Sequence, residues 1–283
     1  DVRTFDLPAT VGGRFSLWSN AAIACRIVLG PEIIAGIRTG AADMDRHFKH
    51  TPIADNLPIR LALLDYWNRN GLARSMRVLL AYARRLRLLP TYLQQLEMES
   101  NGKSVSPSGE AASGPTAPAL WGGEGSVGQH SYHQWLHQGC DVAPTEFVLA
   151  PEPSIDLAGT QALIAHALAQ AEVLANGRTA DEIRKDEPDL DEAIVQQKVH
   201  PGGRPSTMLV AKAFSPEAFG ALIALYEHRT FAAGVLWGIN SFDQWGVERG
   251  KTMAARIKQM LAGSSQSNDP VTQSLIGLLN STD

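Results

Sequence analysis

The stretch Val78-Leu79-Leu80-Ala81-Tyr82 is a short apolar run bounded by polar residues, the pattern of a strand that is buried on both faces. Three further runs of this kind follow along the chain, and each is flanked by polar, glycine or proline residues. They are Ala117–Trp121 (Ala-Pro-Ala-Leu-Trp, the weakest because of its proline), 147–150 (Phe-Val-Leu-Ala) and 208–211 (Met-Leu-Val-Ala). We interpret the four runs as parallel strands of one sheet.

Helical patterns lie between the predicted strands. Residues 86–99 carry apolar side chains near helical spacing, and residues 160–174 are rich in alanine and leucine. Ser215-Pro216-Glu217 predicts a helix start with serine as N-cap, and residues 251–261 predict a last helix. Strands that alternate with helices predict an α/β fold, a three-layer αβα sandwich with a mostly parallel sheet. Ligand sites in such sheets are expected at the carboxyl ends of the strands.

Composition excludes several functional classes. The 283 residues suffice for one large domain or two smaller ones, and 44% hydrophobic with 19% charged residues is typical of a soluble globular protein. A net charge of −4 gives no basic surface for nucleic acid. Cys25 and Cys140 lie far apart without metal-type neighbours, which favours a reduced, cytoplasmic setting. No apolar run approaches the roughly 20 residues of a membrane span, and the first residues have no secretory layout.

A dense polar segment ends the predicted helix 86–99 and continues as Ser100-Asn101-Gly102-Lys103. It contains Glu97 and Glu99, which are separated by one residue and therefore point in different directions on a helix. Glu99 stands at the helix terminus, where a loop begins. A carboxylate in that place can move a carbon-bound proton if its surroundings tune its pKa.

Cationic and amide side chains elsewhere complement this carboxylate. Arg14 follows Gly12-Gly13, which lets the backbone turn tightly and direct a permanent cation inward. An arginine suits a developing oxyanion because it stays protonated. Lys251 lies seven residues after Gln244, two helical turns away on the same face.

Two other patterns leave alternative readings open. Residues 123–128 (Gly-Glu-Gly-Ser-Val-Gly) satisfy the dinucleotide pattern GxGxxG, but the nearest acid at the expected distance, Glu146, begins a strand instead of ending one. His130, His133 and His137 share a helical face at which imidazoles could converge on zinc. We favour one functional histidine with two packing or surface histidines, and we predict neither a metal nor a nicotinamide cofactor.

Three sequence blocks, in order, resemble the glucose-6-phosphate isomerase (phosphoglucose isomerase) family. They cover nearly the whole chain, and two intervening segments are similar as well. The blocks are 12–19 (Gly-Gly-Arg-Phe-Ser-Leu-Trp-Ser), 94–103 with Met98-Glu99-Ser100-Asn101-Gly102-Lys103, and 240–251 from Asn240-Ser241-Phe242-Asp243-Gln244 to Gly250-Lys251; the similar segments are 121–139, with Gly128-Gln129-His130-Ser131, and 220–228.

The resemblance implies reversible interconversion of glucose 6-phosphate and fructose 6-phosphate through a cis-enediol, without a cofactor. Glu99 would carry the proton between C1 and C2, and Arg14 would hold the enediolate charge. Ring opening would fall to His130 and Lys251, and substrate contacts to Gln95 and Gln244. The resemblance also implies a homodimer in which His130 reaches the site from the neighbouring subunit.

The same resemblance predicts how the chain is divided. Residues 1–28 would be the remnant of a first phosphosugar-binding module, 29–243 the second and larger module, and 244–283 a C-terminal helical arm. No Ser-Lys-Thr phosphate cradle is present, so we expect the chain alone to bind phosphosugar poorly and to turn over slowly or not at all. The loop before His130 departs from the family at Gly123-Glu124 and Val127, and His133 replaces an aromatic residue. The alternative function is a non-catalytic phosphosugar-binding or interaction module.

Overall fold

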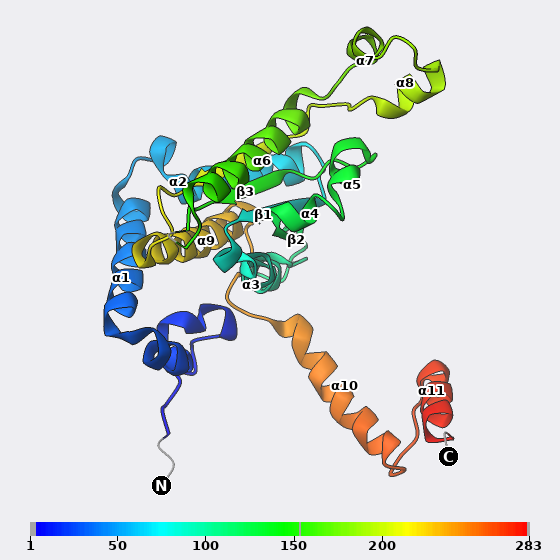
Figure 1. The fold of residues 1–283 in the computed structure, drawn as a ribbon. Helices are drawn as coiled ribbons and strands as arrows, with labels where there is room; N and C mark the ends of the chain where they lie inside the picture. Colours follow the sequence, from blue (N-terminus) through cyan, green and yellow to red (C-terminus); the bar gives the residue numbers. More distant parts are fainter. Residues whose placement is uncertain (1–3, 153, 282–283) are drawn as a thin grey trace. The chain divides into compact units, whose positions relative to one another are not determined.

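A computed structural model describes residues 4–152 and 154–281 of the chain. These residues form two compact units, the first ending at Ser241 and the second beginning at Phe242 (Figure 1). The sheet and the helices that cover it belong to the first unit. The division of that unit at residue 28, which the sequence suggests, stays a prediction.

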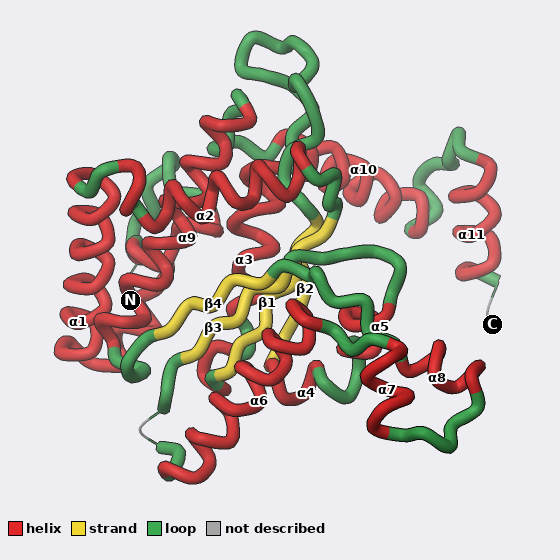
Figure 2. The backbone as a smooth tube through the Cα atoms, turned by 90° about the horizontal axis from the view of Figure 1, so that it is seen from above, coloured by secondary structure: helices red, strands yellow, loops and turns green. Residues whose placement is uncertain are grey.

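The sheet runs in parallel throughout, as predicted. Within the described residues it contains β1 (Met76–Tyr82), β2 (Ala119–Glu124), β3 (Thr145–Leu149) and β4 (Ser206–Val210), in the order β2-β1-β3-β4 (Figure 2). The second strand lies two to three residues later than the run that includes Pro118, because that proline has no amide hydrogen for the ladder.

Helices cover both faces of the sheet, which confirms the three-layer sandwich. Alternate residues of β1 point to opposite faces. Leu79 and Ala81 pack in the core with residues of α3 (Leu89–Leu93) and α9 (Pro216–Trp237). The intervening side chains Val78 and Leu80 pack in a second core with α6 (Leu157–Asn176). Figure 2 shows α9 and α6 on opposite sides of the strands.

The predicted helix 86–99 changes its winding halfway. After α3, the chain continues as the π-helical segment η6 (Gln94–Glu99), in which each turn is wider than in an α-helix. The helix closes where the Gly102 amide donates to the Met98 carbonyl at 2.9 Å. The ammonium of Lys103 then caps the carbonyls of Glu99 and Ser100 at 2.8 and 2.9 Å.

Helix α9 begins as predicted, since the Ser215 hydroxyl accepts the Ala218 amide at 3.1 Å. It packs against α1 (Ile23–His50), which bends at Gly30 where φ is +81°. The two backbones approach so closely that a Cβ on Gly40 would lie 1.9 Å from the carbonyl oxygen of Glu217. Glycine is required at that crossing.

By length and composition alone, the helical stretch 20–50 could cross a membrane. One such helix near the N-terminus is weak evidence, because core helices and signal sequences pass the same test. Ile27 and Val28 in its first half are exposed, whereas Ile37 and Ala41 in its second half are buried. The absence of a membrane therefore stays a prediction.

The remaining elements are shorter or belong to the second unit. Helix α10 begins six residues before the predicted start at Lys251, and it contacts α11. The elements are α2 (Leu57–Tyr66), α4 (Gly125–Gly128), α5 (His133–Gln138), α7 (Ala180–Asp186), α8 (Glu192–Lys198), α10 (Trp245–Leu261) and α11 (Pro270–Asn280).

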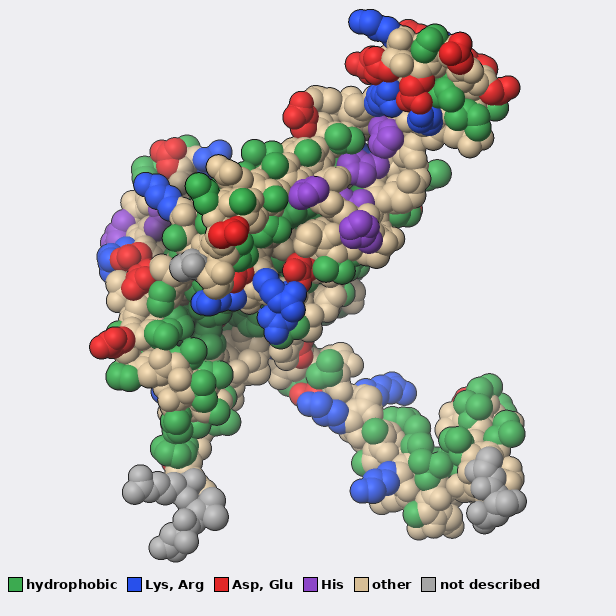
Figure 3. Space-filling model, viewed as in Figure 1, with side chains coloured by type: hydrophobic (Ala, Val, Ile, Leu, Met, Phe, Trp, Pro, Cys, Tyr) green, Lys and Arg blue, Asp and Glu red, His purple; other side chains and the backbone are tan. Residues whose placement is uncertain are grey.

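Histidines gather around α5 and α6 (Figure 3). His133 Nδ1 and His137 Nε2 both lie within hydrogen-bond distance of Gln170 Oε1, at 3.1 and 2.7 Å, so one amide oxygen on α6 holds α5. The prediction of a three-histidine face is wrong, because His130 precedes α5 on a turn. Among the described residues, no group of three or more His, Cys, Asp or Glu side chains is arranged to hold a metal ion.

We expect Gly40→Ala to destabilise the first unit by about 1–3 kcal/mol, because the new methyl group overlaps the Glu217 carbonyl. Chemical denaturation followed by circular dichroism measures this change. Gly250→Ala is the matched control: it is also a helical glycine, but no atom lies within 4 Å of its added Cβ. An unchanged midpoint for Gly40→Ala would contradict the α1–α9 crossing.

We also expect the α5–α6 contact to weaken in acid. Burial lowers the pKa of His133 and of His137 below 6.5, and nearby His200 and Arg204 lower that of His137 further. The unfolded chain therefore binds these protons first as pH falls, and stability is lost below about pH 6.5. Denaturation at several pH values should show a steeper acid loss for the parent chain than for a His133→Gln, His137→Gln double variant. Parallel curves would refute this.

Candidate active site

Arg14 lies at the centre of the site, buried in the short helix η1 (Gly13–Trp18). Its Nε donates to Ser100 Oγ at 2.7 Å and its Nη2 to the Ser241 carbonyl at 3.0 Å. Its Nη1 meets Glu99 Oε2 at 3.2 Å. The sequence predicted an inward-facing cation here, and the structure shows that this cation contacts the predicted base.

Glu99 is the last residue of η6, and its side chain is 21% exposed. Gln95 precedes it by four residues, so both side chains leave the same side of the helix. A Cβ on Gly13 would lie 3.4 Å from Gln95 Nε2, which places that amide beside η1. The structure thus brings together Arg14, Glu99 and Gln95. The carboxylate is accessible, adjacent to a cation, and flanked by an amide that can hydrogen-bond to a hydroxyl group.

Residues that the sequence analysis did not assign to the site fix this arrangement. Asn101 Nδ2 donates to the Thr230 carbonyl of α9 at 2.9 Å. Ser241 Oγ donates to Asn101 Oδ1 at 2.5 Å, while the Ser241 carbonyl accepts from Arg14. Ser100, Asn101 and Ser241 lie in the polar segments 94–103 and 240–251, but only the fold shows that these segments contact one another.

The η1 helix also contacts α9 directly. Trp18 Nε1 donates to both carboxylate oxygens of Glu227, at 2.9 and 3.0 Å. Burial raises the pKa of Glu227 to about 7, an effect that Asp45 adds to and that Trp18 opposes. This contact fixes the segment that carries Arg14.

A buried charge cluster lies beneath η6. Arg229 of α9 binds Asp65 with two hydrogen bonds of 2.7 Å and Glu146 with one of 2.6 Å. Arg77 of β1 binds Asp65 at 3.3 Å and Glu97 of η6 at 2.5 Å. We call these five side chains the charge cluster. Glu97 therefore points into the sheet while Glu99 points to Arg14, as the prediction of divergent directions requires.

Burial dominates the protonation of this cluster. It raises the pKa of Glu97 to about 7 and that of Asp65 to about 6, although Arg77 opposes both shifts. Three carboxyl groups face two guanidinium groups, so full ionisation leaves one uncompensated negative charge. Retaining a proton removes that charge from a site shielded from water.

His130 lies away from the Arg14–Glu99 pair. It is exposed on the turn between α4 and α5, which pack on the α6 side of the sheet. Segment η6 packs on the α9 side, through Leu96. Within one copy of the chain, the sheet therefore separates His130 from Glu99.

Gln244 and Lys251 belong to the second unit, where Gln244 is the N-cap residue of α10 and Lys251 lies inside that helix. Their approach to Glu99 stays a prediction.

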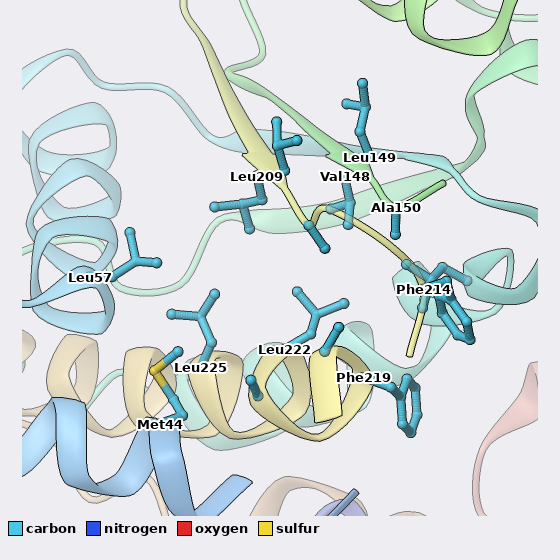
Figure 4. A pocket seen from close by; sticks show the side chains of 15 residues that line it. Met44, Leu57, Val148, Leu149, Ala150, Leu209, Phe214, Phe219, Leu222 and Leu225 are labelled. Carbon is cyan, nitrogen blue, oxygen red and sulfur yellow. The ribbon is translucent and has the colours of Figure 1, made fainter. Parts of the chain in front are cut away.

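Two cavities lie beside the sheet. The crevice at the carboxyl ends of β3 and β4 measures about 210 Å³ and is lined by hydrocarbon (Figure 4), including Val148, Leu209 and Leu222. A second cavity of about 420 Å³ borders Arg14. The Arg14–Glu99 pair instead lies beside the first residues of β2, because η6 runs back along the sheet: the Leu120 amide bonds to Met98 Sδ at 3.3 Å.

The glycines of residues 122–128 have a packing role. A Cβ on Gly122, where φ is +138°, would lie 2.0 Å from the Leu79 carbonyl oxygen, and one on Gly125 would lie 2.2 Å from the Tyr82 ring. The helix that follows, α4, has only four residues. These close contacts with β1 account for the glycines without a dinucleotide.

The chain is similar to known proteins over nearly its whole length. Over 98% of its length the chain is 46% identical to the glucose-6-phosphate isomerase of Caulobacter sp. (strain K31), and it covers 53% of that protein. It is 43% identical to the glucose-6-phosphate isomerase of Dechloromonas aromatica (strain RCB), again covering 53%. The crystal structure of a glucose-6-phosphate isomerase from Chlamydia trachomatis superposes with a TM-score of 0.82 at 36% identity, covering 98% of this chain and 52% of that one.

The chain thus spans about half the length of the relatives it matches. A sequence model of phosphoglucose isomerase matches residues 1–276, which is nearly the whole chain. The fold, the order of the motifs and this match lead to one conclusion: the chain belongs to the phosphoglucose isomerase family.

Proposed function

We propose that this chain carries the proton-transfer machinery of a glucose-6-phosphate isomerase. Glu99 removes the proton from C2 of the open-chain aldose and returns it to C1, while the hydroxyl proton passes from O2 to O1, so that the ketose forms through a cis-enediol. Arg14 stabilises the negative charge that develops on the enediolate oxygen. The observation that carries this proposal is the 3.2 Å contact between the buried Arg14 guanidinium and the accessible Glu99 carboxylate.

Each group suits its step. A carboxylate can act as base and then as acid, which a single proton shuttle between adjacent carbons requires. The Arg14 guanidinium is fixed by Ser100 and Ser241, so it needs little rearrangement when charge develops nearby. Gln95 is placed to bind a substrate hydroxyl, and Gln244 and Lys251 are proposed to complete the site from the C-terminal arm.

We further propose that phosphate binding relies on the half of the family's sequence that this chain does not match. The chain spans about half of its relatives, and no Ser-Lys-Thr cradle occurs in it. Alone, the chain should therefore turn over slowly or not at all. We call the chain joined to the complementary segment of the Caulobacter protein the completed enzyme.

We propose a homodimer in which His130 serves the partner's site. In one copy, His130 and Glu99 lie on opposite faces of the sheet, so a shared site needs a second copy.

Both cysteines, Cys25 and Cys140, are free and exposed, which supports the proposal of a reducing, cytoplasmic location.

We expect Glu99→Gln to lower isomerisation by the completed enzyme by roughly 10²–10⁴-fold, because the amide cannot accept the proton. Exchange of the C2 hydrogen with solvent deuterium, followed by NMR, should fall in parallel. The matched control is Glu110→Gln, which changes an exposed loop carboxylate. Retained C2 exchange in Glu99→Gln contradicts the role of Glu99, and substrate binding without isomerisation in the unmodified enzyme favours the non-catalytic alternative.

A mixing experiment tests the shared site. Glu99→Gln and His130→Ala should each be inactive, whereas unfolding and refolding them together should restore about a quarter of the parent activity. Half of the dimers are then mixed, and each mixed dimer has one intact site. Equal amounts of Glu99→Gln and the double variant Glu99→Gln, His130→Ala form the control and should stay inactive. If the productive pair lay within one copy, mixing would restore nothing.

A further inference from the structure

Segment η6 contacts different partners on each of its sides. Gln94 Nε2 donates to the Leu120 carbonyl at 3.1 Å, and Met98 Sδ accepts the Leu120 amide, so one side faces β2. Leu96 is fully buried in the core below α9. Glu99 faces Arg14. The remaining inward-facing side chain is that of Glu97, which is buried and pairs with Arg77.

Glu97 connects the helix to the middle of the sheet. Its Oε2 accepts a 2.5 Å hydrogen bond from Arg77 Nη2, and Arg77 in turn contacts Asp65 and lies 3.8 Å from Glu146. Arg77 is on β1, an inner strand of the sheet, and is 4% exposed. Any rotation of η6 about its axis would break this bond and take from Arg77 Nη2 the carboxylate that it binds in the interior.

The π-helical winding links the Glu97–Arg77 bond to the orientation of Glu99. Its i→i+5 pattern changes the angle between successive side chains, so Glu97 and Glu99 are directed differently from their directions in an α-helix. π-Helical segments are rare and occur mostly as single turns, frequently at functional sites. The bond to Arg77 fixes the direction of the Glu97 side chain, and the contact with Arg14 lies at the Glu99 side chain.

We propose that the buried Arg77–Glu97 ion pair positions the catalytic carboxylate: by holding the π-helical turn on β1, it sets the orientation in which Glu99 meets Arg14 and the substrate carbon. Arg77 and Glu97 are positioning residues that touch no substrate. The catalytic consequence rests on the proposed function, whereas the effect on the turn itself does not.

The first test measures the turn in the 283-residue chain without any catalysis. Amide hydrogen exchange of residues 97–101 should be at least about tenfold faster in Glu97→Met than in the parent, while amides of β3 are unchanged. Glu97→Gln should restore slow exchange, because its amide oxygen still accepts from Arg77. Tyr226→Phe is the control, because it removes a hydrogen bond to Glu146 of the same cluster and leaves the Arg77–Glu97 bond in place.

A double variant separates positioning from stability. Glu97→Met with Arg77→Met removes one guanidinium and one carboxyl group together. The other carboxyl groups near Arg77, those of Asp65 and Glu146, keep their bonds to Arg229. Apolar replacement of both partners of a buried ion pair is often neutral for stability. We expect a midpoint of unfolding near that of the parent but exchange of residues 97–101 as fast as in Glu97→Met. This variant also serves if Glu97→Met does not fold.

The second test measures catalysis in the completed enzyme. A misdirected base slows proton abstraction, so kcat in the double variant should fall on the order of 10- to 100-fold. The isotope effect on kcat with glucose 6-phosphate deuterated at C2 should rise, which a smaller folded fraction does not produce. Tyr226→Phe and Glu97→Gln should keep the parent isotope effect.

Parent-like exchange of residues 97–101 in the double variant would overturn the proposal. Fast exchange with an unchanged isotope effect and kcat would overturn the positioning role of the pair. If Glu99→Gln retains C2 exchange, the proposed function fails instead, and the exchange data on the turn still decide whether the ion pair holds it.

Discussion

The interaction on which the rest of the structure depends is the buried charge cluster. Its side chains come from α2, β1, η6, β3 and α9, so it joins both inner strands to the helices on one face of the sheet. Unpaired charges in the interior are strongly destabilising, whereas hydrogen-bonded pairs are tolerated. The positions of these elements are therefore mutually constrained, because a shift in any of them would leave a carboxylate or a guanidinium without its partner.

The candidate site is built next to that cluster by a third arginine. Arg14 binds Glu99 and Ser100 at the end of η6, and it binds the carbonyl of Ser241, the last residue of the first unit. It therefore joins the N-terminal part of the first unit to both of these segments. Glu97 and Glu99, two residues apart, bind two different arginines. One carboxylate is buried in the charge cluster, and the other is accessible to solvent. The contrast follows from burial alone, since both are glutamates on one helix.

Most of the fold was predictable from local patterns. Short apolar runs indicated β1, β3 and β4, and the alternation with helices indicated parallel pairing and three layers. The predictions failed where spacing alone cannot define geometry. His130 lies on a turn before α5, so it does not share a face with His133 and His137. The expectation of a site at the carboxyl ends of the strands stays a prediction: those of β3 and β4 border an apolar crevice, whereas Met98, next to Glu99, contacts Leu120 near the start of β2.

The family, the order of strands and helices, and the choice of Glu99 and Arg14 as candidate site residues were all predictable from the sequence, because motifs and periodicity are properties of the chain. Only the tertiary structure decided that Arg14 reaches Glu99, that Glu97 pairs with Arg77 inside the fold, and that His130 lies across the sheet from both. These facts depend on residues up to 227 positions apart, as in the bond from Arg14 to Ser241, and on which face each helix covers. Contacts of that range are set by packing and burial, which no local pattern encodes.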